Sequence, residues 1–372
     1  MAGIYIHIPF CKQACSYCDF HFSTTFSSYR AQLINAICQE IKQEKTYLDD
    51  NTVETIYFGG GTPSLLTKEE ITQLLSAISS NFTVLSSAEI TLEANPDDID
   101  IDRLRGWKSV GINRLSIGLQ SFIQEDLEWM NRAHDAHESY NAVQLAKSYG
   151  FNLTIDLIYG LPGSNLETLE DNLNKAVDLA PDHISAYCLT VEQSTALHHW
   201  VKTGKITPAN EDEQAEQFAY LVDFLSCNGY HQYEISNFAK ENAFSKHNSN
   251  YWKGVKYLGV GPSAHSFNGI SRRWNVANNK KYISLLEKGE TQFEQENLSP
   301  KDRFNEYLMT GLRTVWGVDL EKLNDIHSLT PAFNKALDMF KEHALVFQKD
   351  GILTLTEKGK LQADYIASSL FV

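Results

Sequence analysis

Three cysteines near the start of the chain have the spacing of a metal-binding motif. Cys11, Cys15 and Cys18 are separated by three and two residues and follow a short alternating apolar segment. Thiolates are soft ligands for iron–sulfur clusters and for zinc. A structural zinc site needs four protein ligands, and His7 or His21 could supply the fourth. Three thiolates on an iron–sulfur cluster would instead leave one iron open to another ligand.

A glycine-rich turn and two carboxylates provide further polar groups. The run Gly59–Pro63 reads Gly-Gly-Gly-Thr-Pro, and glycine lets the backbone approach a ligand closely. Glu93 and Asp156 fall in segments that read as buried strands, where a carboxylate needs a partner such as an ammonium, a ribose or a sulfonium. Arg132 could pair with a ligand carboxylate. These residues favour a small-molecule site, although a tight turn and a polar network closing the sheet would use the same residue types.

Short apolar segments rich in β-branched residues alternate with amphipathic segments and predict the elements that position these groups. This alternation is typical of β/α units with right-handed crossovers and a parallel sheet. Six such units fall short of a closed eightfold barrel, so we expect an α/β fold with an open, partial (β/α)6 barrel. The cysteines and the glycine turn would then lie at the carboxyl ends of strands. The predicted strands span residues 3–8, 55–58, 89–93, 114–118, 152–158 and 183–189.

The pattern changes twice along the chain and predicts three parts. Residues 1–236 form the β/α core. Residues 237–300 are rich in Asn, Gly, Ser and aromatic residues without a clear period, and we read them as a connecting segment. Residues 301–372 read as a C-terminal, mainly helical domain with a hairpin whose turn is Lys349–Gly351. Helices followed by a hairpin indicate a winged-helix-like appendage.

Composition excludes some classes of protein. The 372 residues carry 32 Lys and Arg against 47 Asp and Glu, a net charge of −15, which argues against a broad basic face for nucleic acid. No stretch is long and apolar enough for a transmembrane helix, and no signal peptide precedes the first strand. We therefore expect a cytoplasmic protein with reduced cysteines.

The segment Tyr5–Phe20 reads Y-x-H-I-P-F-C-x3-C-x-Y-C-D-F and resembles the radical S-adenosylmethionine (SAM) superfamily. Within it, the chain is similar to the group of oxygen-independent coproporphyrinogen III oxidases and haem chaperones of the HemW family. The resemblance implies a [4Fe–4S] cluster on Cys11, Cys15 and Cys18, with SAM chelating the fourth iron. By the same resemblance, the residues that contact SAM are Tyr5, Gly60, Gly61, Thr62, Glu93, Gln120, Arg132 and Asp156.

Three features favour the haem chaperones over the oxidases. The oxidase pattern has a fourth cysteine where this chain has Phe20, and it has an extension before the cluster motif, whereas Cys11 here lies near the start. Residues 247–252 match the H-N-x-x-Y-W signature of the chaperones. The resemblance thus implies haem as cargo, delivered to haem-dependent proteins such as membrane respiratory enzymes. It is compatible with peripheral membrane contact and a homodimer. The alternatives are decarboxylation of coproporphyrinogen III and a zinc-stabilised scaffold, and whether the chain is an enzyme stays open.

The H-N-x-x-Y-W segment supplies candidate haem contacts. Imidazole and phenolate both ligate haem iron, and aromatic rings stack on a macrocycle. We therefore expect His247, Tyr251 and Trp252 to bind haem, with His265 as a second candidate ligand. The pair 272–273, Arg-Arg, could contact the propionates. A structural loop in which His247 bonds to the backbone is the alternative.

Overall fold

A twelve-stranded sheet runs through most of the molecule in the computed structural model, which describes residues 1–372. Its six central strands are parallel and lie side by side in chain order. This confirms the predicted α/β fold and its partial barrel, since the sheet keeps two free edges and does not close. The central strands are β1 (Ala2–Ile8), β2 (Thr52–Gly60), β3 (Thr83–Ala94), β4 (Arg114–Gln120), β5 (Asn152–Tyr159) and β6 (His183–Cys188).

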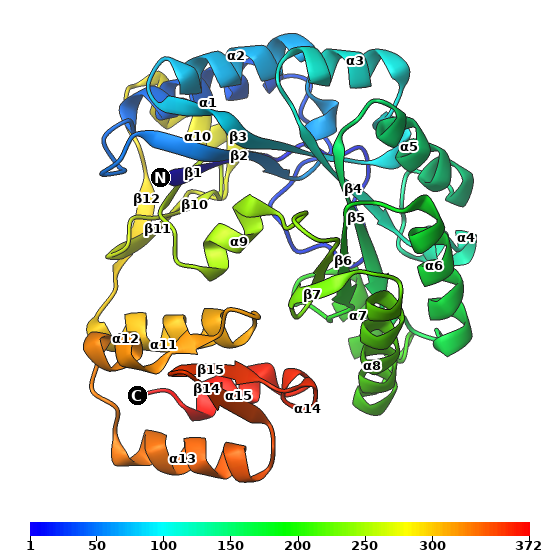
Figure 1. Cartoon of the computed structure of the whole chain (residues 1–372). Helices are drawn as coiled ribbons and strands as arrows, with labels where there is room; N and C mark the ends of the chain where they lie inside the picture. The colour runs from blue at the N-terminus through cyan, green and yellow to red at the C-terminus, as the bar shows by residue number, and fades with distance from the viewer.

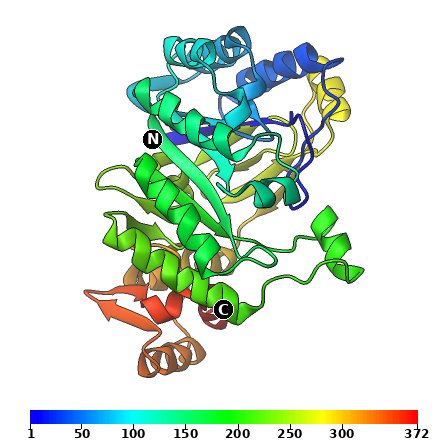
Figure 2. The same ribbon diagram turned by 90° about the vertical axis from the view of Figure 1, so that its right-hand side faces the viewer.

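Helices connect these strands and cover the outer face of the sheet (Figure 1). In α1, Leu33, Ile37 and Ile41 are fully buried and belong to the largest hydrophobic cluster, as the helical spacing of apolar residues requires. Figure 2 shows α7 reaching out beyond the end of the sheet. The helices of this half are α1 (Arg30–Gln43), η1 (Pro63–Leu65), α2 (Lys68–Ser79), η2 (Pro96–Asp98), α3 (Ile101–Ser109), α4 (Gln124–Trp129), α5 (Ala136–Ser148), α6 (Leu166–Leu179), α7 (Ala196–Lys202) and α8 (Glu211–Cys227).

Short strands extend both edges of the central sheet. On one side β8 pairs antiparallel with β6 and carries β7. On the other side β9 pairs parallel with β1 and is followed by β10, β11 and β12. No strand was predicted for residues 237–300, where the strands are only three to five residues long. The elements are β7 (His231–Glu234), β8 (Asn237–Ala239), α9 (Lys246–Trp252), β9 (Tyr257–Val260), β10 (His265–Phe267), β11 (Ser271–Asn275), α10 (Asn279–Glu287) and β12 (Phe293–Asn297).

The C-terminal residues form a module with its own hydrophobic core. Its three-stranded sheet has the order β13-β15-β14. Asp350 and Gly351, at the hairpin turn, both have positive φ angles, 51° and 82°, as a type I′ turn requires. The elements of the module are α11 (Pro300–Leu312), β13 (Val318–Asp319), α12 (Leu320–Ile326), α13 (Pro331–Glu342), β14 (Val346–Lys349), β15 (Ile352–Leu355), α14 (Glu357–Lys360) and α15 (Ala363–Ser369).

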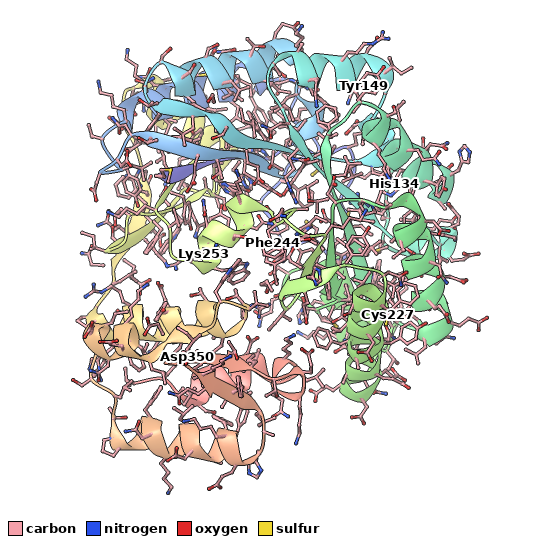
Figure 3. The ribbon with its side chains drawn as sticks, viewed as in Figure 1. His134, Tyr149, Cys227, Phe244, Lys253 and Asp350 are labelled. Carbon is pink, nitrogen blue, oxygen red and sulfur yellow. The ribbon has the colours of Figure 1, made fainter.

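The module docks on the open side of the partial barrel (Figure 1). The amide of Ile235 donates to the carbonyl of Arg313 over 3.1 Å. Phe244 and Lys253, both from the connecting segment, lie between the barrel and the module (Figure 3). The Lys253 ammonium sits 3.9 Å from the centre of the Trp316 ring. The module therefore covers the space at the carboxyl ends of the central strands.

No helix of the structure combines the length and apolar composition needed to cross a membrane.

Candidate cluster and cofactor site

The three cysteines lie between β1 and α1, in a segment that we call the cysteine loop (residues 11–21). All three side chains are partly buried free thiols. The hydroxyl of Thr62 donates to Cys11 Sγ over 3.6 Å, and Arg132 Nη1 donates to Cys15 Sγ over 3.5 Å. Burial raises the pKa of Cys11, and it raises the pKa of Cys18 to about 11. A bound metal centre would lower both values and yield thiolates.

The turn after α4 holds the middle of the cysteine loop. Asn131 Nδ2 donates to the carbonyl of Ala14 over 2.8 Å, and the Ser16 amide donates to the carbonyl of Met130 over 3.1 Å. The backbone of Asn131 is left-handed, with φ of 57°, a conformation that Asn adopts more readily than most residues. The geometry of this turn therefore decides where the loop backbone lies.

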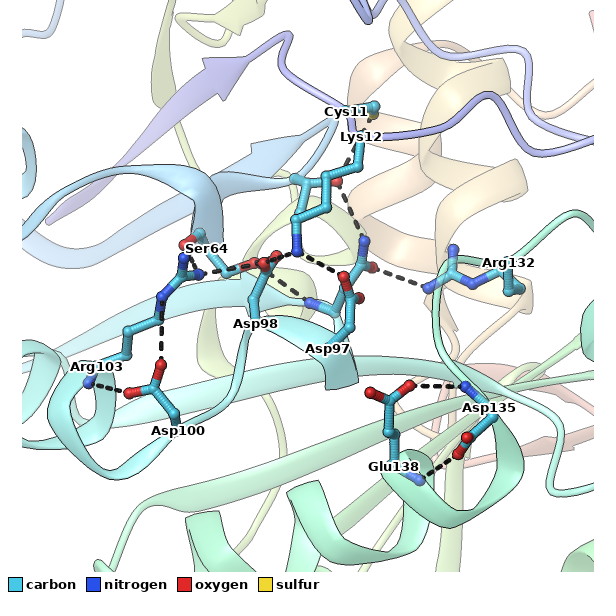
Figure 4. A network of polar contacts seen from close by, with 12 residues as sticks. Cys11, Lys12, Ser64, Asp97, Asp98, Asp100, Arg103, Arg132, Asp135 and Glu138 are labelled. Atoms are coloured by element: carbon cyan, nitrogen blue, oxygen red, sulfur yellow. Dashed lines mark hydrogen bonds and ion pairs between the residues drawn. The ribbon is translucent and has the colours of Figure 1, made fainter.

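An ion-pair network holds the start of the cysteine loop against the end of β3 (Figure 4). The Lys12 ammonium lies 2.6 Å from Asp97 and 2.5 Å from Asp98. Asp98 is fully buried and also accepts a 2.8 Å hydrogen bond from the Ser64 hydroxyl. Lys12 follows the first cysteine directly, so the network fixes that thiol relative to the carboxyl ends of the neighbouring strands.

A cavity of about 680 Å³ opens beside the cysteine loop, and we call it the first cavity. It is lined by all three cysteines and by polar groups from the ends of β2, β3, β4 and β5. Of the eight residues expected to contact SAM, only Tyr5 does not line it. The other seven, which do, are Gly60, Gly61, Thr62, Glu93, Gln120, Arg132 and Asp156.

Two partly buried carboxylates, Glu93 and Asp156, line the first cavity. Glu93 accepts a 2.8 Å hydrogen bond from the Tyr57 hydroxyl and a 3.2 Å hydrogen bond from the Gly60 amide. Asp156 accepts from the Ser116 hydroxyl at 3.3 Å. Burial raises the pKa of Glu93 to about 7 and the pKa of Asp156 to about 6. A cationic ligand beside them would favour their ionised forms and offset the cost of burial.

Arg132 and Gln120 add polar groups to the lining of the first cavity. Arg132 Nη2 donates to Asn95 Oδ1 over 2.8 Å and to the carbonyl of Gly118 over 2.7 Å, while its Nε is buried without a partner. Gln120 has a positive φ of 69° at the end of β4. Such strain concentrates at ligand sites. The guanidinium therefore keeps donor capacity that a ligand carboxylate could use.

The backbone of the glycine turn packs closely against β1 and the residues that follow it. A Cβ on Gly60 would lie 2.6 Å from the His7 ring, and a Cβ on Gly61 would lie 2.7 Å from the carbonyl oxygen of Phe10. Gly60 also has a φ of 108°, which side chains rarely allow. The absence of side chains here leaves backbone as the surface of the first cavity.

Several residues that line the first cavity were missed by sequence reasoning. Arg313 and Asp364 come from the C-terminal module, and their side chains pair over 3.2 Å. Arg313 also pairs with the buried carboxylate of Glu234 over 3.0 Å. No local motif marks these positions, because they reach the cavity only through docking of the module. Other lining residues that the sequence did not indicate include Tyr17, Tyr187, Cys188 and Asn248.

A second cavity, of about 780 Å³, lies between the extended sheet edge and the C-terminal module. Tyr5, expected beside SAM, lines this cavity instead, together with Tyr251, Trp252 and His265. Asp19 and Phe20 line both cavities, so the cysteine loop is their shared wall.

His247, the leading candidate haem ligand in the sequence, lines neither cavity. It is 2% exposed, and its Nδ1 shares a 2.8 Å hydrogen bond with the Thr55 hydroxyl. Its Nε2 shares a 2.9 Å hydrogen bond with the Tyr251 hydroxyl. Burial lowers the pKa of His247 to about 3, so the ring is neutral. In this arrangement His247 fixes the position of the Tyr251 hydroxyl through their hydrogen bond.

Both members of the Arg-Arg pair at 272–273 already have carboxylate partners. Arg272 contacts Glu306 over 2.7 Å, and Arg273 contacts Glu44 over 2.6 Å. Neither guanidinium is therefore a free cation for propionates.

The donor set of the first cavity fits an iron–sulfur cluster with one open position. Three soft thiols lie on one loop and face carboxylate, amide and guanidinium groups suited to a polar ligand. His7 and His21, the candidate fourth ligands of a zinc site, line the second cavity and not the first.

Comparisons with known proteins agree with this fold and donor set. Residues 5–176 match the radical SAM superfamily, and residues 298–361 match the HemN C-terminal domain. The coproporphyrinogen III oxidase HemN from Escherichia coli, described as a radical SAM enzyme, superposes with a TM-score of 0.86 at 24% identity. That match covers 100% of this chain and 90% of that chain, and it shows that the two chains share a fold. The fold and the cysteine loop thus define a radical SAM protein, a class that implies a [4Fe–4S] cluster and SAM.

Curated relatives narrow the class further. The heme chaperone HemW of Bacillus subtilis (strain 168) is 35% identical over 366 residues, which cover 97% of this chain and 97% of that protein. HemW of Escherichia coli (strain K12) is 37% identical over 271 residues, covering 71% of this chain and 69% of that protein. The chain belongs to the HemW family.

Proposed function

We propose that this protein binds haem and delivers it to haem-dependent proteins, with a [4Fe–4S] cluster held by Cys11, Cys15 and Cys18 and SAM beside it. The observation that carries the proposal is the similarity to heme chaperones named HemW over nearly the whole length of both chains. The shared cavity of the three thiols and the seven expected SAM contacts supports the cofactor part.

The residues of the first cavity have distinct roles in this proposal. A cluster bound there would supply one-electron reducing power next to SAM. Glu93 and Asp156, when ionised, balance the positive charge of SAM. Arg132 holds the SAM carboxylate, and the bare backbone of Gly60 and Gly61 lets the ligand approach closely.

The finer statements about partners follow from the family resemblance. The targets would be haem-dependent proteins such as membrane respiratory enzymes, reached from the cytoplasm by peripheral contact. A homodimer is compatible with this role. We also propose that residues 1–236, 237–300 and 301–372 are the three domains of the chain.

One anaerobic experiment tests the proposal against its main alternative. The full chain is reconstituted with iron and sulfide, and the cluster is verified by absorbance and iron content. Haem is then titrated into it, while a second sample receives SAM, a reductant and coproporphyrinogen III. We expect saturable haem binding and no decarboxylated tetrapyrrole by mass spectrometry. Protoporphyrinogen formed together with 5′-deoxyadenosine would overturn the proposal in favour of the oxidase, and absence of haem binding would refute it outright.

A further inference from the structure

The second cavity has the size and position of a cofactor pocket. Its volume of about 780 Å³ falls within the roughly 300–1,000 Å³ of small-molecule and cofactor sites. One wall comes from the extended sheet edge, β9 to β11, and the opposite wall from α11 and α12 of the C-terminal module. Figure 1 shows these elements facing each other, with α9 beside them. A ligand here would therefore contact both halves of the molecule.

Aromatic side chains from several elements surround this cavity. Trp252, Tyr257 and Phe267 come from the sheet side, and Tyr307 comes from the module. Phe20 of the cysteine loop is 67% exposed although it is a large apolar side chain. Exposed aromatic faces in a concave site suit a flat apolar macrocycle, because stacking buries both surfaces.

The hydrogen bonds of the neighbouring histidines decide which ring is free to bind a metal. His7 shares hydrogen bonds with the Tyr5 hydroxyl and the His21 carbonyl, and both nitrogens of His247 are also engaged. His21 binds Asn279 through Nε2 over 2.7 Å. One ring nitrogen of His21 is therefore engaged as well.

His265 differs from all of these rings. It lines the second cavity, is exposed, and has no hydrogen-bond partner on either ring nitrogen among the 120 side-chain and terminal hydrogen bonds of the chain. It projects from β10, where its backbone pairs with that of Trp274. The Trp274 ring stacks on it with a centroid distance of 5.9 Å. A regular strand and a stacked neighbour thus hold an unoccupied imidazole toward the cavity.

The module wall supplies cations without carboxylate partners. Arg303 lines the second cavity, and its Nε is buried with no hydrogen-bond partner. Lys322 also lines the cavity, where its ammonium lies 4.4 Å from the centre of the Tyr307 ring. Neither residue takes part in a salt bridge, whereas Arg272 nearby is paired with Glu306 through two hydrogen bonds. Unpaired cations facing a cavity in a chain of net charge −15 indicate an anionic ligand.

We infer that haem binds in the second cavity, with His265 as a ligand of its iron and with Arg303 and Lys322 beside its propionates. This inference rests on the proposed function and assigns its site. Iron–imidazole ligation and carboxylate pairing are the two polar interactions that haem offers to a protein. Here they come from opposite walls, so one molecule would join the sheet edge to the C-terminal module.

Haem titration of matched variants of the full chain tests this assignment. The wild type is compared with H265A, H265Q, H21A, R303Q and a control, H343A, in which an exposed histidine outside both cavities is removed. The readouts are the dissociation constant, the Soret band and the electron paramagnetic resonance spectrum of ferric haem. Circular dichroism checks that each variant folds.

We expect H265A and H265Q to lose the histidine-ligated spectrum and to bind haem about tenfold or more weakly. Added imidazole should restore the spectrum of H265A. R303Q should keep the spectrum but weaken binding by roughly tenfold, as expected for loss of a charge-assisted hydrogen bond. H343A should match the wild type.

Two outcomes would overturn the assignment without touching the proposed function. One is a wild-type spectrum and affinity in H265A, and the other is loss of ligation in H21A with H265A unchanged. A wild type that binds no haem at all would instead refute the proposed function itself.

Discussion

Glu93 and Asp156 are two carboxylates of one cavity whose protonation changes near neutral pH. Burial raises the pKa of Glu93 to about 7 and the pKa of Asp156 to about 6. Below these values each group is neutral and no longer attracts a cation. The affinity of the first cavity for a positively charged ligand is therefore expected to depend on pH.

We predict that SAM binding weakens as the pH falls from 7.5 to 5.5, by up to about tenfold per pH unit below the pKa of Glu93. The sulfonium of SAM keeps its charge in this range, whereas its α-amino group has a pKa of about 8, so the comparison with a variant that lacks the carboxylate isolates the contribution of the protein. Anaerobic calorimetry of the cluster-loaded chain measures it. E93Q should bind SAM more weakly at pH 7.5 and show a flatter pH profile. A pH-independent wild type would contradict the role of this carboxylate.

The hydrogen bonds of His247 lead to a second prediction about a single residue. Its ring is buried and bonded to Thr55 and Tyr251, so H247A leaves a cavity and two unpaired hydroxyls. We expect a loss of about 2–4 kcal/mol in the free energy of unfolding, measured by urea denaturation. The exposed control H343A should change it by less than about 0.5 kcal/mol. If H247A kept full stability and lost only haem ligation, this structural role would be wrong.

The cysteine loop is the element on which the first cavity depends, and one turn controls it. Asn131 contributes both a left-handed backbone and a side-chain hydrogen bond to Ala14. These two contributions can be separated by substitution, because glycine keeps the backbone conformation without the side chain.

We predict that N131G keeps a near-wild-type free energy of unfolding but releases iron to a chelator faster than the wild type. N131A loses the hydrogen bond and also strains the backbone, at a cost of about 1–2 kcal/mol. Absorbance of the reconstituted cluster during chelation measures the first effect, and urea denaturation measures the second. Equal iron release from N131G and the wild type would show that the Ala14 contact does not hold the loop.

Local signals explain which elements could be predicted from the sequence. The cysteine spacing, the glycine turn and the six central strands are encoded within short stretches of residues, and these predictions agree with the structure. The strands of 237–300 are too short to show a period. The environment of His247 depends on Thr55, 192 residues away, and Arg313 reaches the first cavity only through docking of the module. Such placements follow from tertiary packing, which no local pattern contains.

At the scale of the whole molecule, Arg313 fastens the C-terminal module to the barrel. Its Nη2 pairs with Glu234, whose side chain is 1% exposed, and its Nη1 pairs with Asp364, whose side chain is 75% exposed. The two ion pairs of one guanidinium therefore lie in different surroundings, and only the buried one should affect stability strongly.

We predict that R313L loosens the module and destabilises the protein by roughly 3 kcal/mol, because a buried carboxylate loses its cation. Calorimetry should show a separate transition for the module, and limited proteolysis should cut near residues 297–300. The matched variant D364N breaks only the exposed pair and should cost less than about 1 kcal/mol. Equal behaviour of R313L and D364N would mean that the Glu234 pair does not hold the module.

Phe20 and Asp19 line both cavities, so two ligands would share the partition that these side chains form. If the first ligand changes the position of this partition, it changes the affinity for the second by a factor that must be the same in the reverse direction. Binding of the cluster and SAM in the first cavity would then control loading or release of haem in the second cavity, through the one phenylalanine that contacts both.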